Sequence, residues 1–512
     1  MSKGKKQALT LLGLCVLMAA AICLYFIVPR GDSEESAEEG NTAETVNVAK
    51  IEKDKITSVS ITGEGREDIS LEKNGEDWKL KDMPDVSLDA DTVEGMFSGL
   101  SPVTASKELD SEGVQLSDYG LDQPQMTVKI TTSDGQEYEF RFGGTVPVTG
   151  GNYGLTEDGG KIYTFSETLY SAFDIEKNSL IAKEEVADIN SDYLTSISVK
   201  NDGKETFRAE VVSDSKKVDA YTNWVISKPY KKLLAGSSTE DWTTLEGFFT
   251  SVTFGDLVEY GCSDFGKYGL KQPSSTVEVG YFEVKDGYEI PETTADPDST
   301  SKSSASTNKA SEVPEEYREN KGYTLYIGKK ADSGDYYVRL KGSQNVYTMS
   351  ASNVENMTGA DAYTYMDKCV YSTLATDIKG YDAVIGDKKI SVTRSTEKGD
   401  DGKDKNVWIL NGKKVSDEKE EEFLTPYSKA YLLEFTSKAK DSVKPESDTP
   451  VMTIVYHEEG RDVTVKYLPY DGTNFYRVDK DGMDYFLVDK RSVDDTVASF
   501  ESLLELDQSE KK

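Results

Sequence analysis

Two stretches of the 512-residue chain carry the same motif: residues 118–124 read DYGLDQP and residues 267–273 read KYGLKQP. In both, the closing proline is followed three residues later by Thr-Val, and a third proline, Pro450, is followed at the same distance by Thr-Ile. Self-similarity of this kind is the sequence signature of tandem structural units. The pattern therefore predicts three copies of one unit, and the third copy lacks the Tyr-Gly-Leu residues of the other two.

Tryptophans provide a second landmark. Trp78, Trp224 and Trp408 each end a hairpin-like stretch, and they stand 46, 49 and 42 residues before the three prolines. Dipeptides that favour tight hairpin turns recur near them, at 74–75, 202–203 and 411–412. We therefore expect every unit to open with strands joined by short turns.

An amphipathic helix is predicted next in each unit. In the first copy Asp89 is placed to cap the helix, and in the second Ser238 and Asp241 form a possible capping box. In the third copy Pro426 leaves the start of the helix open. Alternating strands and a short closing helix complete each unit. The predicted fold class is strand-rich α+β in three tandem repeats, each with hairpins, one amphipathic helix, antiparallel strands and a closing helix.

The same spacing divides the chain into segments. Residues 291–320 are rich in Ser, Thr, Pro, Asp and Glu and nearly free of large apolar residues, so we expect a disordered insertion there. The predicted segments are a cytoplasmic N-terminus (1–7), a transmembrane anchor (8–28), an acidic linker (29–48), repeat one (49–187), repeat two with the insertion (188–373), a divergent repeat three (374–505) and a tail (506–512).

The N-terminus has the pattern of a membrane anchor. Residues 8–28 carry no charge, and 21 apolar-rich residues are enough for a helix to cross the hydrocarbon core. Lys3, Lys5 and Lys6 precede this stretch, and acidic residues follow it. The positive-inside bias predicts a single-pass protein of the cell membrane, with its N-terminus in the cytoplasm and the bulk of the chain outside. A cleaved signal peptide and a lipoprotein remain the alternatives.

Composition excludes several classes of function. Asp and Glu number 93 against 59 Lys and Arg, which gives a formal charge of -34. Such a surface repels phosphates, so no nucleic-acid partner is expected. The single histidine, His457, rules out metal chemistry that needs two or more histidines. No cofactor is predicted, because neither a phosphate-binding lysine loop nor a dinucleotide-binding motif is present.

We predict that the protein is not an enzyme and name no catalytic residue. A serine triad would need His457 to meet a serine and an acid in space, and the Ser-x-x-Lys spacings lack their companion motifs. Carboxylate pairs for glycoside hydrolysis meet only in the folded chain, so the sequence does not exclude them. An extracellular hydrolase therefore stays as a second alternative.

Metal binding and cross-linking stay open as well. No metal ligand is named, although Asp479, Asp481 and Gly482 resemble part of a calcium loop that a β-turn also explains. Cys262 and Cys369 are the two cysteines outside the predicted anchor. Their compartment would allow a disulfide, and the sequence does not tell whether they form one.

The repeated motif is interpreted as structural. Gly120 and Gly269 are expected to adopt a backbone angle that other residues resist. Leu121 and Leu270 are expected to pack, and Pro124 and Pro273 to precede strands where no donor is needed. The alternative is a ligand-binding role for Tyr119 and Tyr268.

This layout resembles the bacterial family called domain of unknown function 4340. The residues that carry the resemblance are the Tyr-Gly-Leu-x-x-Pro motifs and Trp78, Trp224, Trp408 and Pro450. The resemblance covers about residues 50–505 as tandem copies. It implies an extracytoplasmic protein similar to auxiliary proteins of ABC-type exporters, including those linked to gliding motility, and it implies no catalytic residues.

The leading functional hypothesis is a non-enzymatic, membrane-anchored accessory or binding component of an ABC-type export or cell-envelope system. Its partners would be the membrane, transporter permease or ATPase subunits, or a cell-envelope polymer. The alternative is a scaffold or adhesion module that binds cell-wall glycan or a surface protein without a transporter.

Overall fold

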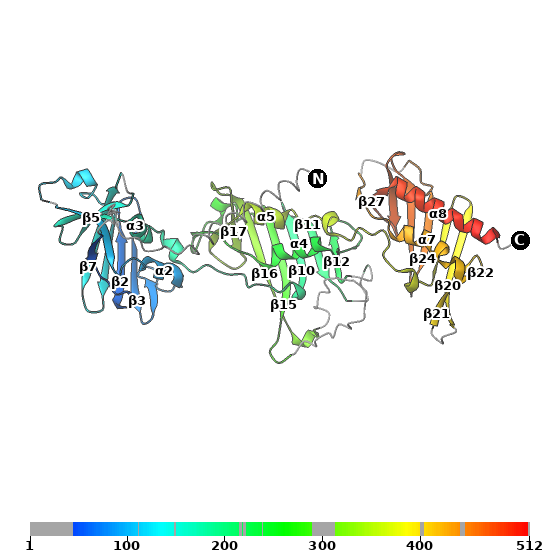
Figure 1. Ribbon diagram of the computed structural model, residues 1–512, viewed down its shortest axis with the longest axis horizontal. Helices are drawn as coiled ribbons and strands as arrows, with labels where there is room; N and C mark the ends of the chain where they lie inside the picture. The colour runs from blue at the N-terminus through cyan, green and yellow to red at the C-terminus, as the bar shows by residue number, and fades with distance from the viewer. Residues whose placement is uncertain are drawn as a thin grey trace, which may run out of the picture. The chain divides into compact units, whose positions relative to one another are not determined.

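The computed structural model describes residues 45–110, 112–147, 150–213, 218, 222–237, 239–288, 313–399, 404–440 and 446–509. Within these residues there are three nine-stranded sheets, and the chain divides into two compact units, Met1–Ser70 with Met96–Asp174 and Leu71–Gly95 with Ile175–Lys512. The second and third sheets both lie in the second unit. The predicted strand-rich α+β class with three tandem repeats is confirmed (Figure 1).

The first sheet is built from the first repeat. In spatial order its strands are β1 (Val46–Ala49), β5 (Val103–Asp110), β9 (Lys161–Phe165), β8 (Asn152–Thr156), β7 (Glu137–Thr145), β6 (Met126–Thr132), β2 (Ile56–Thr62), β3 (Ile69–Asn74) and β4 (Asp77–Leu80).

The second sheet has the order β13 (Leu234–Ala235), β12 (Trp224–Lys228), β11 (Lys204–Val211), β10 (Leu194–Asn201), β15 (Ser275–Val284), β16 (Arg318–Lys330), β17 (Tyr336–Leu340), β18 (Val346–Met349) and β14 (Leu257–Glu259). The third has the order β22 (Lys413–Lys414), β21 (Asp404–Leu410), β20 (Lys388–Lys398), β19 (Gly380–Ile385), β24 (Met452–His457), β25 (Asp462–Pro469), β26 (Phe475–Lys480), β27 (Met483–Asp489) and β23 (Ser437–Lys438).

The strand order is the same in all three repeats. Read from β4 to β5, the first sheet repeats the order that runs from β12 to β14 in the second and from β21 to β23 in the third. The second and third sheets add the short edge strands β13 and β22, whereas the first adds β1 at its opposite edge. The third repeat therefore keeps the topology although it has lost the Tyr-Gly-Leu motif.

Helices occupy equivalent places in the three repeats. Figure 1 shows α4 and α5 across one face of the second sheet and α7 and α8 across one face of the third. The helices are α2 (Ala90–Met96), α3 (Glu167–Phe173), α4 (Glu240–Thr250), α5 (Ala351–Thr358), α6 (Ala362–Tyr365), α7 (Glu420–Tyr431) and α8 (Lys490–Ser509). Three of them, α3, α5 and α8, are the closing helices that the sequence predicts.

The predicted helix starts are borne out in part. The Asp89 carboxylate accepts a hydrogen bond from the Thr92 backbone N–H at 2.7 Å, which is the expected N-cap of α2. In the second repeat the N-cap is Thr239, while Ser238 lies outside the described residues. In the third, α7 begins at Glu420 and continues through Pro426, which is buried.

The conserved position of the tryptophans follows from packing between sheet and helix. Trp224 on β12 lies 5.3 Å from Trp242 on α4, and Trp408 on β21 lies 5.7 Å from Phe423 on α7, measured between ring centroids. Both strand tryptophans are buried, whereas Trp78 on β4 is half-buried. The hairpins of Trp224 and Trp408 thus present a large apolar surface to the helix beside them.

Three segment boundaries differ from the sequence-based expectation. Strand β1 begins at Val46, inside the predicted linker, because Val46 and Val48 alternate with polar residues and pair with β5. Residues 313–320 are ordered, although they fall within the predicted insertion 291–320: Val313 is fully buried against Phe282, and β16 starts at Arg318. Helix α8 extends into the predicted tail. Residues 289–312 lie outside the described part of the chain.

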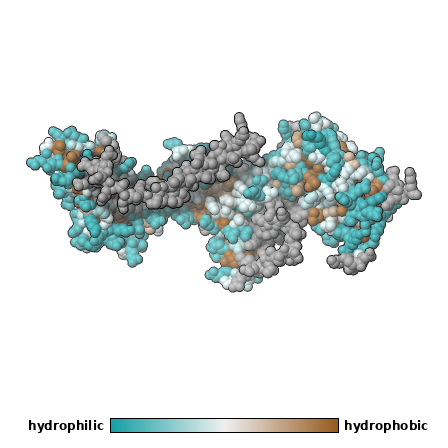
Figure 2. Space-filling model, in the orientation of Figure 1, coloured by the Kyte–Doolittle hydropathy of each residue, from teal (hydrophilic) through white to brown (hydrophobic). Residues whose placement is uncertain are grey.

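The described residues on the face seen in Figure 2 are largely hydrophilic. This agrees with the formal charge of -34 and the mean hydropathy of -0.55. The apolar residues are concentrated in the cores between sheets and helices.

The core of the third repeat is unusually rich in tyrosine. Tyr456 stacks on Tyr371 with ring centroids 3.6 Å apart, and Tyr381 and Tyr467 are buried as deeply. The hydroxyls of Tyr381, Tyr456 and Tyr467 have no hydrogen-bond partner among the described residues. By contrast, the Tyr427 hydroxyl donates to the Thr373 carbonyl oxygen at 2.8 Å.

Replacing Tyr456 with phenylalanine is expected to raise the free energy of unfolding by about 1 kcal/mol, because the stacking ring stays and an unpaired buried hydroxyl goes. Tyr427→Phe is the matched control and should lower it by about 1 kcal/mol, since a hydrogen bond is lost. Urea unfolding of both variants measures the difference. Equal destabilisation by the two substitutions would contradict this account of the core.

Candidate functional site

The Tyr-Gly-Leu motif forms a turn in both repeats that carry it. The tyrosines end short 3-10 helices, Leu116–Tyr119 and Phe265–Tyr268, and the following glycines are left-handed, with φ of 67° at Gly120 and 73° at Gly269. This is the backbone angle that the sequence predicts. The leucines that follow are buried, with 3% of Leu121 and 1% of Leu270 exposed.

A second glycine, on a neighbouring strand, completes each turn. A Cβ atom on Gly143 of β7 would lie 2.3 Å from the Tyr119 carbonyl oxygen, and one on Gly328 of β16 would lie 2.1 Å from the Tyr268 carbonyl oxygen. No real side chain fits at such a distance, so the turn packs directly onto strand backbone. In the third sheet the equivalent strand position, one residue after Tyr467, is Leu468. Loss of the motif and loss of the glycine therefore occur together.

The motif tyrosines have the contacts of packing residues. The Tyr119 ring lies edge-on to Tyr153 on β8, with the ring centroids 4.9 Å apart. The Tyr268 ring lies 4.8 Å from Tyr337 on the equivalent strand β17. The Tyr268 hydroxyl also donates to Glu259 at 2.7 Å. Pro124, Pro273 and Pro450 each lie two residues before a strand of their own sheet. The motif residues thus serve their separate sheets, and the structure does not bring them together into one site.

The other residues considered for chemistry are also separate. The His457 ring lies 2.8 Å from Asp462 and 3.3 Å from Asp382, and the hydrogen bond to Asp462 contributes most to raising its pKa. Cys262 and Cys369 are free thiols. Asp481 and Gly482 form the turn between β26 and β27, and the Gly482 N–H donates to Asp479. Within the described ranges no group of three or more candidate ligands could hold a metal ion.

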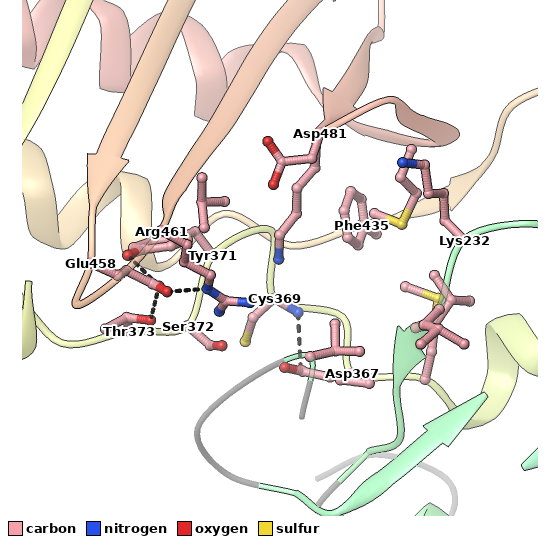
Figure 3. Close-up of a pocket in the computed structure, with 18 residues that line it drawn as sticks. Lys232, Asp367, Cys369, Tyr371, Ser372, Thr373, Phe435, Glu458, Arg461 and Asp481 are labelled. Carbon is pink, nitrogen blue, oxygen red and sulfur yellow. Dashed lines mark hydrogen bonds and ion pairs between the residues drawn. The ribbon is translucent and has the colours of Figure 1, made fainter. Parts of the chain in front are cut away.

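One cavity, the joint pocket, is lined in part by residues from the stretch 366–373, which belongs to the connector between the second and third sheets. It has a volume of about 160 Å³, which is the size of a cavity that holds a benzene-sized molecule. Figure 3 shows its residues converging from both repeats. The apolar part of its lining consists of Val218, Leu233, Leu234, Ala235, Met366, Phe435, Val463 and Met483.

Glu458 is a charged group of the joint pocket with three hydrogen-bond donors around it. Its carboxylate accepts hydrogen bonds from the Tyr371 hydroxyl and the Thr373 hydroxyl at 2.9 Å each, and from Arg461 Nε at 2.5 Å. Burial acts to raise the pKa of Glu458, but the hydrogen bonds from these three donors outweigh it and hold the pKa below its usual value. Glu458 is therefore an ionised anchor at neutral pH.

Arg461 is held in place by this anchor. Its side chain is half-exposed and lines the joint pocket, and Nε is the nitrogen bonded to Glu458. Among the described residues no acceptor is bonded to its two terminal nitrogens, which is the part of a guanidinium that takes a carboxylate or phosphate. Figure 3 shows Arg461 extending between Glu458 and Cys369.

The Cys369 thiol of the joint pocket is held in its protonated form. Burial, assisted by the neighbouring charge of Asp367, raises the pKa of its thiol to about 12. A thiol with this pKa stays protonated at neutral pH, and the thiolate is the nucleophile. Cys369 therefore adds an apolar contact near the Asp367 carboxylate, which accepts the Cys369 backbone N–H at 3.1 Å.

Sequence reasoning missed the joint pocket because its residues come from two repeats. In the sequence Glu458 is merely the residue after His457, and its pairing with Arg461 three residues later depends on the turn between β24 and β25. Gly143 and Gly328 occupy equivalent positions, so a comparison of the two repeats could have identified them. Each directly follows the strand residue that pairs with the second residue after the motif proline.

The fold places the chain in a class of tandem-repeat proteins whose unit is one antiparallel sheet with helices on one face. A family model described as domain of unknown function (DUF4340) matches residues 78–246 and 224–446, and the chain belongs to this family. Each match begins at a hairpin tryptophan, Trp78 or Trp224, and ends in the next repeat. No curated protein and no solved structure matches the chain.

The predicted anchor, residues 8–28, lies outside the described residues. Within the part of the chain that is described, no helix is both long enough and apolar enough to span a membrane.

Proposed function

We propose that the protein is a non-enzymatic binding component of the bacterial cell envelope, tethered by its N-terminal segment with the three repeats outside the membrane. The observation that carries the binding role is the joint pocket. There, an arginine fixed by Glu458 lines the same cavity as a set of apolar side chains, and together they suit a ligand with an acidic group beside an apolar one.

Two polar groups of the joint pocket, Glu458 and Cys369, support binding more than catalysis. Glu458 has three donors on its carboxylate, and Cys369 holds its proton at neutral pH. A general base or nucleophile needs a free lone pair near neutral pH. His457 adjoins Glu458 in sequence, but its ring is engaged by Asp382 and Asp462.

The link to an ABC-type exporter rests on the resemblance of the family and on the sequence. The chain has no phosphate-binding lysine loop, so ATP-driven work at this site would come from a partner subunit. A transporter permease exposed outside the membrane is the proposed partner. Cell-wall glycan, or a surface protein without a transporter, would be the partner of a simple scaffold.

A photo-crosslinking amino acid at position 233 in living cells tests this proposal. Leu233 lines the joint pocket and is 46% exposed, whereas Val384, the matched control on β19, is 37% exposed and lies outside the pocket. We expect position 233 to yield a crosslink to a permease subunit and position 384 to yield none. Protease added to the intact cells should digest the chain beyond about residue 30.

Equal crosslinking from both positions would show that the joint pocket is not a binding site. Protection of the whole chain in intact cells, with digestion after lysis, would reverse the proposed location. A crosslink only to glycan would replace the exporter by the scaffold function.

A further inference from the structure

The connectors that join the sheets are bound to the preceding repeat in the same way. In the first connector residues 180–182 lie along residues 87–89, with Leu88 opposite Ile181. Two backbone hydrogen bonds hold this pairing: Asp89 N–H to Leu180 O at 2.9 Å and Ala182 N–H to Ser87 O at 3.0 Å.

The second connector repeats this pairing one repeat later. Residues 365–367 lie along residues 235–237, with Gly236 opposite Met366. The bonds are Ser237 N–H to Tyr365 O at 2.8 Å and Asp367 N–H to Ala235 O at 3.0 Å. In both connectors the central apolar residue is buried, with 3% of Ile181 and 2% of Met366 exposed. Each connector is therefore bound to the preceding repeat by a three-residue backbone pairing and by one buried apolar side chain.

The third repeat has the same receiving edge. Strand β22 pairs with β21 as β13 pairs with β12, and the Val415 N–H donates to Trp408 O at 2.9 Å just as Gly236 donates to Trp224 O at 2.9 Å. Residues 414–416 are thus equivalent to residues 235–237. Within the described ranges no connector lies along them. Lys414 and Ser416 are exposed, whereas the equivalent Ala235 is half-buried and Ser237 is buried.

We propose that residues 414–416 are a docking edge for an extended segment of a partner polypeptide with a large apolar residue at its centre. The partner strand would accept a hydrogen bond from the Ser416 N–H and donate one to the Lys414 carbonyl oxygen. This is strand addition at a sheet edge, for which main-chain bonds supply affinity and the central side chain supplies selectivity. The edge lies beside the β22 label in Figure 1.

A second copy of this chain fits the edge less well. The segment that precedes β1 would be its connector-like donor, and it reads Ala-Glu-Thr at residues 43–45, without a large apolar residue. The occupant is therefore assigned to another polypeptide, and self-association is an outcome of the test.

The test uses the full chain and a labelled peptide of the first connector, SLIAKEE, which is the sequence of residues 179–185. Ser416 has φ of -71°, which proline adopts without strain, so Ser416→Pro removes the N–H donor and keeps the backbone. Ser416→Ala is the matched control, because the Ser416 side chain makes no capping hydrogen bond. Fluorescence anisotropy measures binding, and thermal unfolding checks that both variants are folded.

We expect the peptide to bind the parent and Ser416→Ala alike and to bind Ser416→Pro about tenfold more weakly, which corresponds to one backbone hydrogen bond. A peptide with aspartate in place of the residue-181 isoleucine should not bind. Absence of binding to the parent, or equal binding to Ser416→Pro, overturns the proposal. Concentration-dependent self-association that Ser416→Pro abolishes would assign the edge to a second copy and so overturn the assignment to another polypeptide.

Discussion

Gly328→Val is expected to lower the free energy of unfolding of the second repeat by about 3 kcal/mol or more. The first side-chain atom would lie 2.1 Å from the Tyr268 carbonyl oxygen and 3.1 Å from the Leu270 side chain. Neither neighbour is the end of a flexible chain, so β16 or the Tyr-Gly-Leu turn must move. Chemical unfolding followed by tyrosine and tryptophan fluorescence measures the loss.

The third sheet supplies the control for this substitution. Leu468 occupies the equivalent strand position without a Tyr-Gly-Leu turn packed on it, so Leu468→Val should change stability by less than about 1.5 kcal/mol. Tyr268→Phe should have a small effect as well, because the ring contact with Tyr337 remains and the hydrogen bond to Glu259 is lost. If Gly328→Val is as stable as the parent, the close approach of the two backbones is not a constraint, and the recurrence of the motif needs a functional reason.

Glu246→Gln is expected to remove a pH dependence of stability. Glu246 on α4 is 2% exposed, and burial raises the pKa of its carboxyl to about 7, although the Trp242 indole N–H, 3.1 Å away, opposes this by stabilising the charged form. Because the folded state holds the proton more tightly than the unfolded chain, the stability gained is complete below about pH 4.5 and is lost as the pH rises through 7. The shift corresponds to roughly 3 kcal/mol.

Unfolding at pH 5 and pH 8 measures this effect. The parent should be less stable at pH 8 than Glu246→Gln by about 2–3 kcal/mol, and the two proteins should be similar at pH 5. Glu420→Gln is the control, since Glu420 accepts the same kind of bond from the Trp408 indole at 3.2 Å but is only half-buried. A variant at position 246 that follows the pH profile of the parent would show that the carboxyl is not the source of the dependence.

The repeat architecture could be predicted because it rests on local signals. Prolines before strands, tryptophans at hairpins and Asp-Gly or Asn-Gly turns recur at related spacings, and each has a local physical cause. The strand order could not be predicted, because pairs such as β2 with β6 depend on contacts between residues far apart in the chain. Composition also gave a wrong end for the predicted disordered insertion 291–320. Val313 is the one large apolar residue in a polar stretch, yet it is buried beside Phe282.

The joint pocket depends on contacts that the sequence of one repeat does not contain. Leu233 belongs to the second repeat, Cys369 to the connector and Arg461 to the third repeat. An alignment of the repeats places each of these residues beside the equivalent residue of another repeat. It does not show that the three residues are close to one another. The joint pocket therefore exists only in the folded chain, where the connector and both repeats contribute residues to it.

Seating the connectors through peptide groups has a consequence for how a repeat chain of this kind tolerates sequence change. Backbone N–H and C=O groups are the same in every residue except proline, so substitutions at residues 87–89 or 235–237 seldom remove the bonds that hold a connector. Gene segments that encode one unit can then be duplicated, deleted or allowed to diverge while the junctions stay intact. The third repeat is an example of such divergence: it has lost its Tyr-Gly-Leu turn and retains both its strand order and its junction with the second.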